Sequence, residues 1–157
     1  MKTEKATFAA GCFWQVETEF RKVKGVLNTK VGYTGGKMKN PTYKNVCTDT
    51  TGHAEAIDIE FDPKIVSYEK LLDVFWKIHN PTTLNRQGLD MGTQYRSAIF
   101  YHNETQKKQA EASLKKTQKN FKNKIVTEIK KAPEFYKAEE YHQKYLDKNL
   151  VQRLFRL

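Results

Sequence analysis

The residues Gly11-Cys12-Phe13-Trp14 carry the strongest chemical signal in the chain. An expected strand ending Phe8-Ala9-Ala10 runs into Gly11, and a helical pattern follows. We therefore expect Cys12 on the first turn of a helix, where unpaired N–H groups and a partial positive charge favour thiolate over thiol. A free cysteine has a pKa of about 8.5 and is mostly protonated at neutral pH, so lowering that pKa would make Cys12 a nucleophile.

The side chains after Cys12 divide between two faces of the predicted helix. The buried stripe consists of Phe13, Val16, Phe20 and Val23. Trp14 lies off this stripe on the face of Glu17, so its ring either packs under a loop or forms one wall of an apolar pocket beside the sulfur. The spacing leaves both interpretations open. Glu17 receives a structural role, with Arg21 four residues on as its expected partner.

A second candidate group lies on the predicted strand 54–61. Strict alternation places Glu55 in phase with Ile57, Ile59 and Phe61. A carboxyl group buried in that company has a raised pKa and can act as a general acid. The alternative is that Glu55, near the start of its strand, lies at the sheet edge and points into water. The pattern supports both interpretations equally.

Composition limits the other kinds of chemistry. The chain has two cysteines, Cys12 and Cys47, which are too few for a disulfide scaffold and lack Cys-x-x-Cys spacing. Any thiol chemistry therefore begins with one cysteine, and we expect no metal or organic cofactor. The net charge of +10 raises the possibility of nucleic-acid binding. However, lysines between residues 106 and 131 coat the solvated face of a predicted helix, so specific nucleic-acid binding is not expected.

The remaining pattern indicates one α+β domain over residues 1–157. Strands are expected at 5–10, 26–33, 54–61, 94–102 and 125–129, with helices after Cys12 and Ser67, the basic helix, and an irregular tail from about 132. These elements predict a two-layer sandwich with a mixed or antiparallel sheet. No membrane-length apolar run or secretory signal occurs, so a soluble cytoplasmic protein without membrane attachment is expected.

Three further residues are candidates because of their segments. Tyr43 lies in a long loop at 37–52 and Asp90 in a second at 81–92, and long ordered loops tend to be functional. Together with Tyr95, these residues can converge on Cys12. His79 ends its helical stripe, where a packed, cationic side chain is more typical than a catalytic base.

Several blocks of the chain, in order, resemble the A-type peptide methionine sulfoxide reductases. They are Gly11-Cys12-Phe13-Trp14, Gly32-Tyr33-Thr34-Gly35-Gly36, Asn40-Pro41-Thr42-Tyr43, Gly52-His53-Ala54-Glu55-Ala56, His79-Asn80-Pro81-Thr82, Gly92-Thr93-Gln94-Tyr95-Arg96-Ser97 and Glu140-Tyr141-His142-Gln143. The resemblance implies reduction of methionine S-sulfoxide, free or in proteins, on a ferredoxin-like core.

The resemblance also implies individual roles. The cysteine matching Cys12 attacks the sulfoxide sulfur, while the groups matching Glu55, Tyr43 and Tyr95 bind the sulfoxide oxygen. A sulfoxide sulfur is a poor electrophile until its oxygen is protonated or strongly hydrogen-bonded, so this chemistry needs an acid. Phe13 and Trp14 match the aromatic walls that receive the terminal methyl group. Asp90 matches a polar residue that helps to hold the hydrogen-bond network of the site.

Recycling is where the chain departs from many members of that family. The product on Cys12 would be a sulfenic acid, which in those members is attacked by cysteines of a C-terminal tail. Residues 147–157 contain no cysteine, and Cys47 does not match the usual resolving position. We expect a single-cysteine reductase that is regenerated by thioredoxin, glutaredoxin or a small thiol.

Three other functions remain open. A cysteine hydrolase would need a histidine base near Cys12, and His53 is the candidate. A thiol peroxidase would consume peroxide and ignore methionine sulfoxide. A basic nucleic-acid-binding module would show steep salt dependence that survives loss of Cys12.

Overall fold

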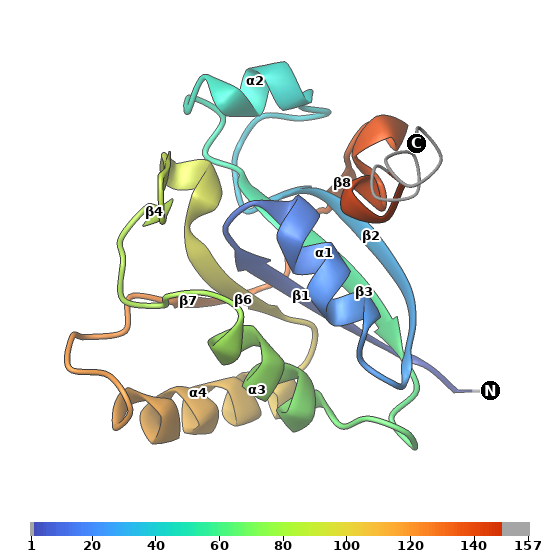
Figure 1. Ribbon diagram of the computed structural model, residues 1–157, viewed down its shortest axis with the longest axis vertical. Coiled ribbons are helices and arrows are strands. Elements are labelled where there is room, and N and C mark those ends of the chain that lie inside the picture. The colour runs from blue at the N-terminus through green and yellow to red at the C-terminus, as the bar shows by residue number, and fades with distance from the viewer. Residues whose placement is uncertain (1, 149–157) are drawn as a thin grey trace, which may run out of the picture.

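The computed structural model describes residues 2–148, which build a six-stranded mixed sheet in the order β7-β6-β1-β3-β2-β8 (Figure 1). Its strands are β1 (Glu4–Ala10), β2 (Val26–Thr34), β3 (Ala54–Phe61), β6 (Ser97–Tyr101), β7 (Glu128–Lys131) and β8 (Tyr136–Lys137). The β6–β7 pair is parallel and the other pairs are antiparallel. The predicted α+β class with a mixed sheet is confirmed.

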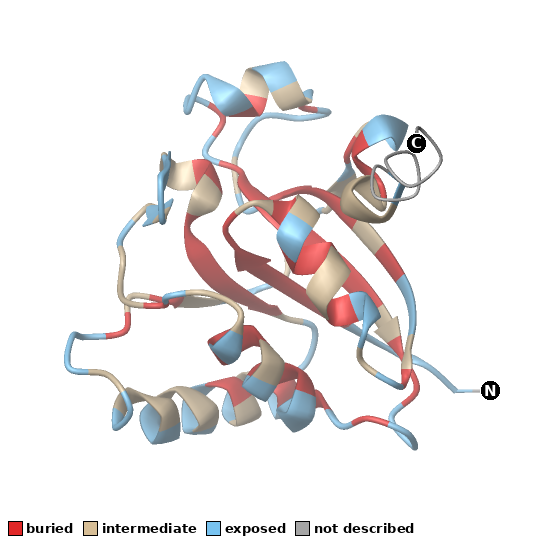
Figure 2. Cartoon of the chain, viewed as in Figure 1, coloured by how far each residue is buried: buried red, intermediate tan, exposed pale blue. Residues whose placement is uncertain are grey.

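Helices cover one face of this sheet. They are α1 (Phe13–Arg21), α3 (Tyr68–Lys77) and α4 (Glu104–Gln118), with a short α2 (Tyr43–Cys47) at one end of the sheet (Figure 1). The main core lies between helices and strands, where the Phe8 ring is 5.3 Å from that of Phe20 and 5.2 Å from that of Phe75. This single helical layer gives the two-layer arrangement, with buried residues concentrated on the sheet (Figure 2).

The two long loops contain more structure than the sequence pattern indicated. The first holds α2, capped by a reciprocal hydrogen-bond pair between Thr42 and Asn45. The second forms a separate hairpin of β4 (Arg86–Gln87) and β5 (Asp90–Met91). Both are built from short local contacts, which produce no extended periodicity in the sequence.

Three predicted boundaries are wrong. The strand expected at 94–102 begins at Ser97, because Thr93–Tyr95 forms a 3-10 turn (η1) after Gly92, whose φ is 136°. The basic helix ends at Gln118, and the strand expected at 125–129 begins at Glu128.

Part of the predicted irregular tail is ordered by contacts with the sheet. The segment 136–137 pairs with β2 as β8, and Glu140–His142 forms a second 3-10 turn (η2). Residues 149–157 of that tail lie outside the described residues. Within residues 2–148, no helix is both long enough and apolar enough to cross a membrane.

Candidate active site

The candidate residues meet at one end of the sheet. At that end β1 finishes with Ala10, which pairs with Ser97 at the start of β6. In β2, Tyr33 pairs with Glu55 near the start of β3. The turn after β1 therefore delivers Cys12 to the sheet end that carries Glu55.

Cys12 occupies the N-cap position of α1 and is half-buried. Burial raises the pKa of its thiol to about 11; the backbone N–H groups of Trp14 and Gln15 oppose this, while Glu55 and Asp90 raise the pKa further. The expectation of a lowered pKa is therefore wrong for the resting protein. The helix N-terminus does act in the expected direction, but desolvation outweighs it.

Glu55 is buried, with 1% of its surface exposed, on a strand that lies between β1 and β2. The alternative of an edge carboxylate in water is therefore wrong. The backbone N–H of Phe13 donates to Glu55 Oε1 at 3.2 Å, whereas Oε2 is buried and has no hydrogen-bond partner among the described residues. Burial raises the pKa of Glu55 to about 8, opposed by the Phe13 N–H and assisted by Asp90. The carboxyl group is thus mainly protonated at neutral pH.

Two tyrosine hydroxyls and one carboxylate lie within electrostatic range of this pair. Tyr43 begins α2 and Tyr95 ends η1, and both are half-buried. Burial, with the nearby carboxyl group of Glu55, raises the pKa of each hydroxyl, so both are neutral hydrogen-bond donors. Asp90 is exposed on β5, and its charge acts on both Cys12 and Glu55.

The two aromatic candidates have different environments. Phe13 is buried, with its ring 5.8 Å from that of Tyr33. Trp14 is half-buried and stacks on Tyr145 with ring centroids 3.9 Å apart. Its Nε1–H donates to Nδ1 of His142 at 2.9 Å. Both rings, on the two residues that follow Cys12, are therefore held by contacts with other aromatic side chains.

The C-terminal segment supports the site through contacts that individual residues of the sequence did not predict. His142 is fully buried, and its ring lies 4.3 Å from that of Tyr43 and 5.2 Å from that of Phe13. Glu139 accepts hydrogen bonds from the Tyr33 hydroxyl and the Tyr43 backbone N–H, both at 3.0 Å. The block 140–143 of the family resemblance pointed to His142 but did not include Glu139.

Buried polar side chains attach this segment to the rest of the fold. The Gln143 amide bonds both the N–H and the C=O of Val31, at 2.9 and 2.8 Å. Glu17 accepts from the Thr29 hydroxyl at 2.8 Å and from the Lys144 N–H at 2.5 Å. Glu17 is thus structural as predicted, but its predicted partner is wrong, because Arg21 pairs with Asp147.

The histidines named by the sequence analysis are engaged elsewhere. His53 is buried, its Nδ1 accepts from the Gly36 N–H at 3.0 Å, and its Nε2 donates to the Met38 carbonyl at 2.6 Å. His79 bonds the Phe75 carbonyl and the Ser97 hydroxyl, and burial lowers its pKa to about 4. His79 is packed as expected but neutral rather than cationic. The hydrolase alternative therefore lacks an available base in His53.

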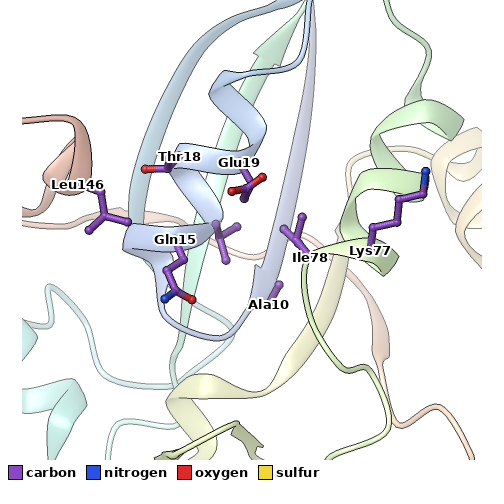
Figure 3. A pocket seen from close by; sticks show the side chains of 8 residues that line it. Ala10, Gln15, Thr18, Glu19, Lys77, Ile78 and Leu146 are labelled. Carbon is purple, nitrogen blue, oxygen red and sulfur yellow. The ribbon is translucent and has the colours of Figure 1, made fainter. Parts of the chain in front are cut away.

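A cavity of about 490 Å³ beside α1 does not include the candidate residues. It lies between α1 and the end of α3 (Figure 3), and is lined by Ala10, Gln15, Val16, Thr18, Glu19, Lys77, Ile78 and Leu146. The lining contains no cysteine, histidine or tyrosine. In the described part of the chain, no three His, Cys, Asp or Glu side chains group as metal ligands.

Comparison with known proteins gives one consistent result. Residues 4–155 match the model of the family described as peptide methionine sulfoxide reductase. A peptide methionine sulfoxide reductase MsrA of Methanosarcina acetivorans is 65% identical over 92% of this chain and 78% of its own length.

Two solved structures of a yeast protein extend this result. Mxr1 from Saccharomyces cerevisiae in reduced form has a TM-score of 0.91 and 41% identity, covering 94% of this chain and 86% of its own. A complex of Mxr1 with Trx2 has a TM-score of 0.67 and 28% identity, covering 92% and 85%.

These findings, with the sheet and the buried thiol–carboxyl pair, define a thiol-dependent oxidoreductase. The chain belongs to the peptide methionine sulfoxide reductase family, of the A type. It reduces methionine S-sulfoxide to methionine and so repairs oxidative damage. The predicted family and reaction are confirmed.

Proposed function

We propose that Cys12 removes the sulfoxide oxygen and that Glu55 supplies the proton that makes this possible. The observation that carries the proposal is the protonated, buried carboxyl group of Glu55, held by the Phe13 N–H with its second oxygen unpartnered. A neutral carboxylic acid in an apolar site is a strong donor to an incoming oxygen. The sulfoxide oxygen takes the vacant position at Oε2.

The electron and proton balance is complete with these two residues. Glu55 donates its proton to the sulfoxide oxygen while the Cys12 sulfur forms a bond to the sulfoxide sulfur, and the thiol proton passes to the Glu55 carboxylate. The bond between the two sulfurs and the substrate S–O bond then break as the protonated oxygen moves to the Cys12 sulfur, where it becomes the hydroxyl of a sulfenic acid. The substrate sulfur is reduced by two electrons and the Cys12 sulfur is oxidised by two.

The raised pKa of Cys12 suits this order of events. At pH 7 the resting site holds a thiol and a carboxylic acid, because burial disfavours both anions. Little of Cys12 is therefore present as a thiolate that could react with peroxide or be protonated by solvent. The thiol loses its proton only when a bound sulfoxide has taken the proton of Glu55, so the apparent pKa values belong to the pair.

The other site residues position the substrate. The neutral hydroxyls of Tyr43 and Tyr95 donate to the sulfoxide oxygen beside Glu55. The rings of Phe13 and Trp14 receive the terminal methyl group, which gains from removal of its surface from water. Asp90 maintains the proton on Glu55 through its negative charge.

Regeneration is proposed to use an external thiol in the cytoplasm. Cys47 is exposed on α2, and the sequence has no third cysteine. The Mxr1–Trx2 complex supports thioredoxin as the reductant, with glutaredoxin or a small thiol as the other candidates. Residues 1–157 act as one catalytic unit in this scheme.

A single-turnover assay tests the proposal. Without reductant, the protein should convert one equivalent of methionine S-sulfoxide per molecule and leave a sulfenic acid on Cys12, read by mass spectrometry after trapping. Cys12→Ser should form no methionine, while Cys47→Ser should still give one equivalent. Formation of more than one equivalent of methionine per protein molecule without added thiol contradicts the scheme. Trapping of a sulfenic acid on any residue other than Cys12 contradicts it too.

A further inference from the structure

Most of the exposed large apolar side chains belong to segments that also carry a candidate site residue. Among the described residues, seven large apolar side chains are exposed: Leu27, Met38, Ile65, Leu84, Leu89, Met91 and Tyr141. Three of them belong to the β4–β5 hairpin and the residues just before it. Met38 lies in the loop that leads to α2, and Tyr141 is adjacent to His142. Only Leu27 and Ile65 come from segments without a candidate site residue.

The hairpin is held directly against the turn that carries the nucleophile. A methyl group added at Gly11 would lie 2.8 Å from Cγ of Gln87, so the Gln87 side chain covers this turn. The Gln87 amide is itself fixed, because it accepts from the Asn80 N–H at 3.0 Å and donates to the Asn80 C=O at 2.5 Å. Across the hairpin, Gln87 pairs with Asp90, whose charge acts on Cys12.

The exposed apolar side chains of the hairpin and of the residues just before it lie outside the hydrophobic core. Leu84 is 69% exposed, Leu89 101% and Met91 72%. Figure 2 shows the hairpin as mostly exposed. Groups of exposed apolar residues beside a site mark interaction surfaces, because water-exposed apolar area has a free-energy cost that a partner can remove.

The reaction itself says what meets this surface. When the oxidised methionine is part of a polypeptide, the residues before and after it must lie on the protein surface next to the site. We propose that Leu84, Leu89 and Met91, here called the hairpin rim, bind the residues flanking the oxidised methionine and favour apolar ones. This inference rests on the proposed site at Cys12 and adds the preferred substrate, an extended polypeptide segment whose apolar side chains are accessible.

A comparison of three substrates tests the hairpin rim. They are free methionine S-sulfoxide, a peptide with leucine and valine flanking the sulfoxide, and the same peptide with serine flanks. In single turnovers without reductant, Leu89→Ser should lower the second-order rate constant for the apolar peptide about fivefold, and Leu84→Ser/Leu89→Ser about tenfold or more. Rates for the serine peptide and the free amino acid should stay within about twofold.

Ile65→Ser is the matched control, since Ile65 is 52% exposed in the segment between β3 and α3. It should leave all three rates unchanged. Leu89 is fully exposed, so its substitution removes no packing. If the hairpin-rim variants lose the same fraction of the rate constant on all three substrates, or lose none on any, the proposal is wrong. A defect confined to thioredoxin-dependent turnover assigns the surface to the reductant and overturns the proposal too. Failure of the Cys12 scheme shows separately, as absence of methionine formation in the unaltered protein.

Discussion

The two parts of the active site are attached to the fold by different means. Cys12 and Glu55 are placed by the sheet, because the register of β1, β2 and β3 brings the turn after Ala10 to the start of β3. The segment 136–145 has only a two-residue strand and is otherwise held by side-chain hydrogen bonds to distant backbone groups. The proposed reacting groups are thus positioned by the sheet, and the proposed aromatic wall is completed by a separately attached segment.

This difference predicts how each part responds to substitution. A substitution of Glu55 on β3 should affect the chemical step and leave the fold in place, because β3 is held by neighbouring strands on both sides. A change in the C-terminal segment should affect the pocket and hence substrate binding. Substitutions in the two parts therefore separate kcat from KM.

Glu55→Gln should give the largest effect. The amide keeps the shape but cannot supply the proton, so kcat should fall by about 10²–10³-fold with little change in KM. In the unaltered protein, single-turnover methionine formation should fall as the pH rises through about 8, where Glu55 loses its proton. The residual activity of the variant should lack this decline. An unchanged kcat in the variant would remove Glu55 from the mechanism.

The same variant has a second readout in folding stability. The pKa of Glu55 is about 8 in the folded state and lower in the unfolded chain, so the folded state binds more protons between these values. The free energy of unfolding should therefore decrease as the pH rises from about 4.5 to about 8. Glu55→Gln removes this decrease, and denaturant titrations at pH 5 and pH 8 measure it. Equal slopes in both proteins would show that Glu55 is not protonated when folded.

His142→Phe should give an intermediate effect. It preserves the packed ring but removes the acceptor for the Trp14 Nε1–H, which costs about one hydrogen bond, and KM should rise about fivefold with kcat nearly constant. His142→Asn, which can place an amide oxygen near the same position, should recover part of the loss. Tryptophan fluorescence should report the change around Trp14. A fall in kcat at unchanged KM would mean that His142 serves the chemical step instead.

Cys47→Ser should have the smallest effect. Cys47 lies on the exposed side of α2, and its thiol influences the hydroxyl of Tyr43. Steady-state turnover with an external thiol should stay within about twofold of the unaltered protein. Loss of recycling with retention of one turnover would instead make Cys47 the resolving cysteine and join α2 to the redox chemistry.

The positions of Cys12 and Glu55 on their elements were predictable from local pattern, whereas the burial of Glu55 was not, because the pattern also allowed an exposed sheet edge. Alternation along 54–61 put Glu55 on an apolar face, and the glycine before Cys12 marked the turn from strand to helix. Both signals work because a strand or helix repeats its geometry over consecutive residues. The family resemblance supplied the substrate, which no spacing contained.

The supporting contacts were not predictable in the same way. His142 and Gln143 act over more than one hundred residues of sequence, on Trp14 and Val31, and such pairs leave no periodic trace. The strand expected at Tyr95 failed because one glycine at φ 136° starts a 3-10 turn. The direction of the Cys12 pKa shift depends on how far the folded protein excludes water from the thiol. The position of Cys12 at a helix N-terminus does not predict this desolvation.

The attachment of residues 136–145 to β2 has a consequence for biosynthesis. Cys12 is made before His142 and Gln143, which complete its surroundings and lie more than one hundred residues later in the chain. A chain emerging from the ribosome therefore carries its thiol long before the pocket around it can close. We therefore expect the Cys12 thiol to be more accessible to oxidants during translation than in the folded protein, where it is half-buried.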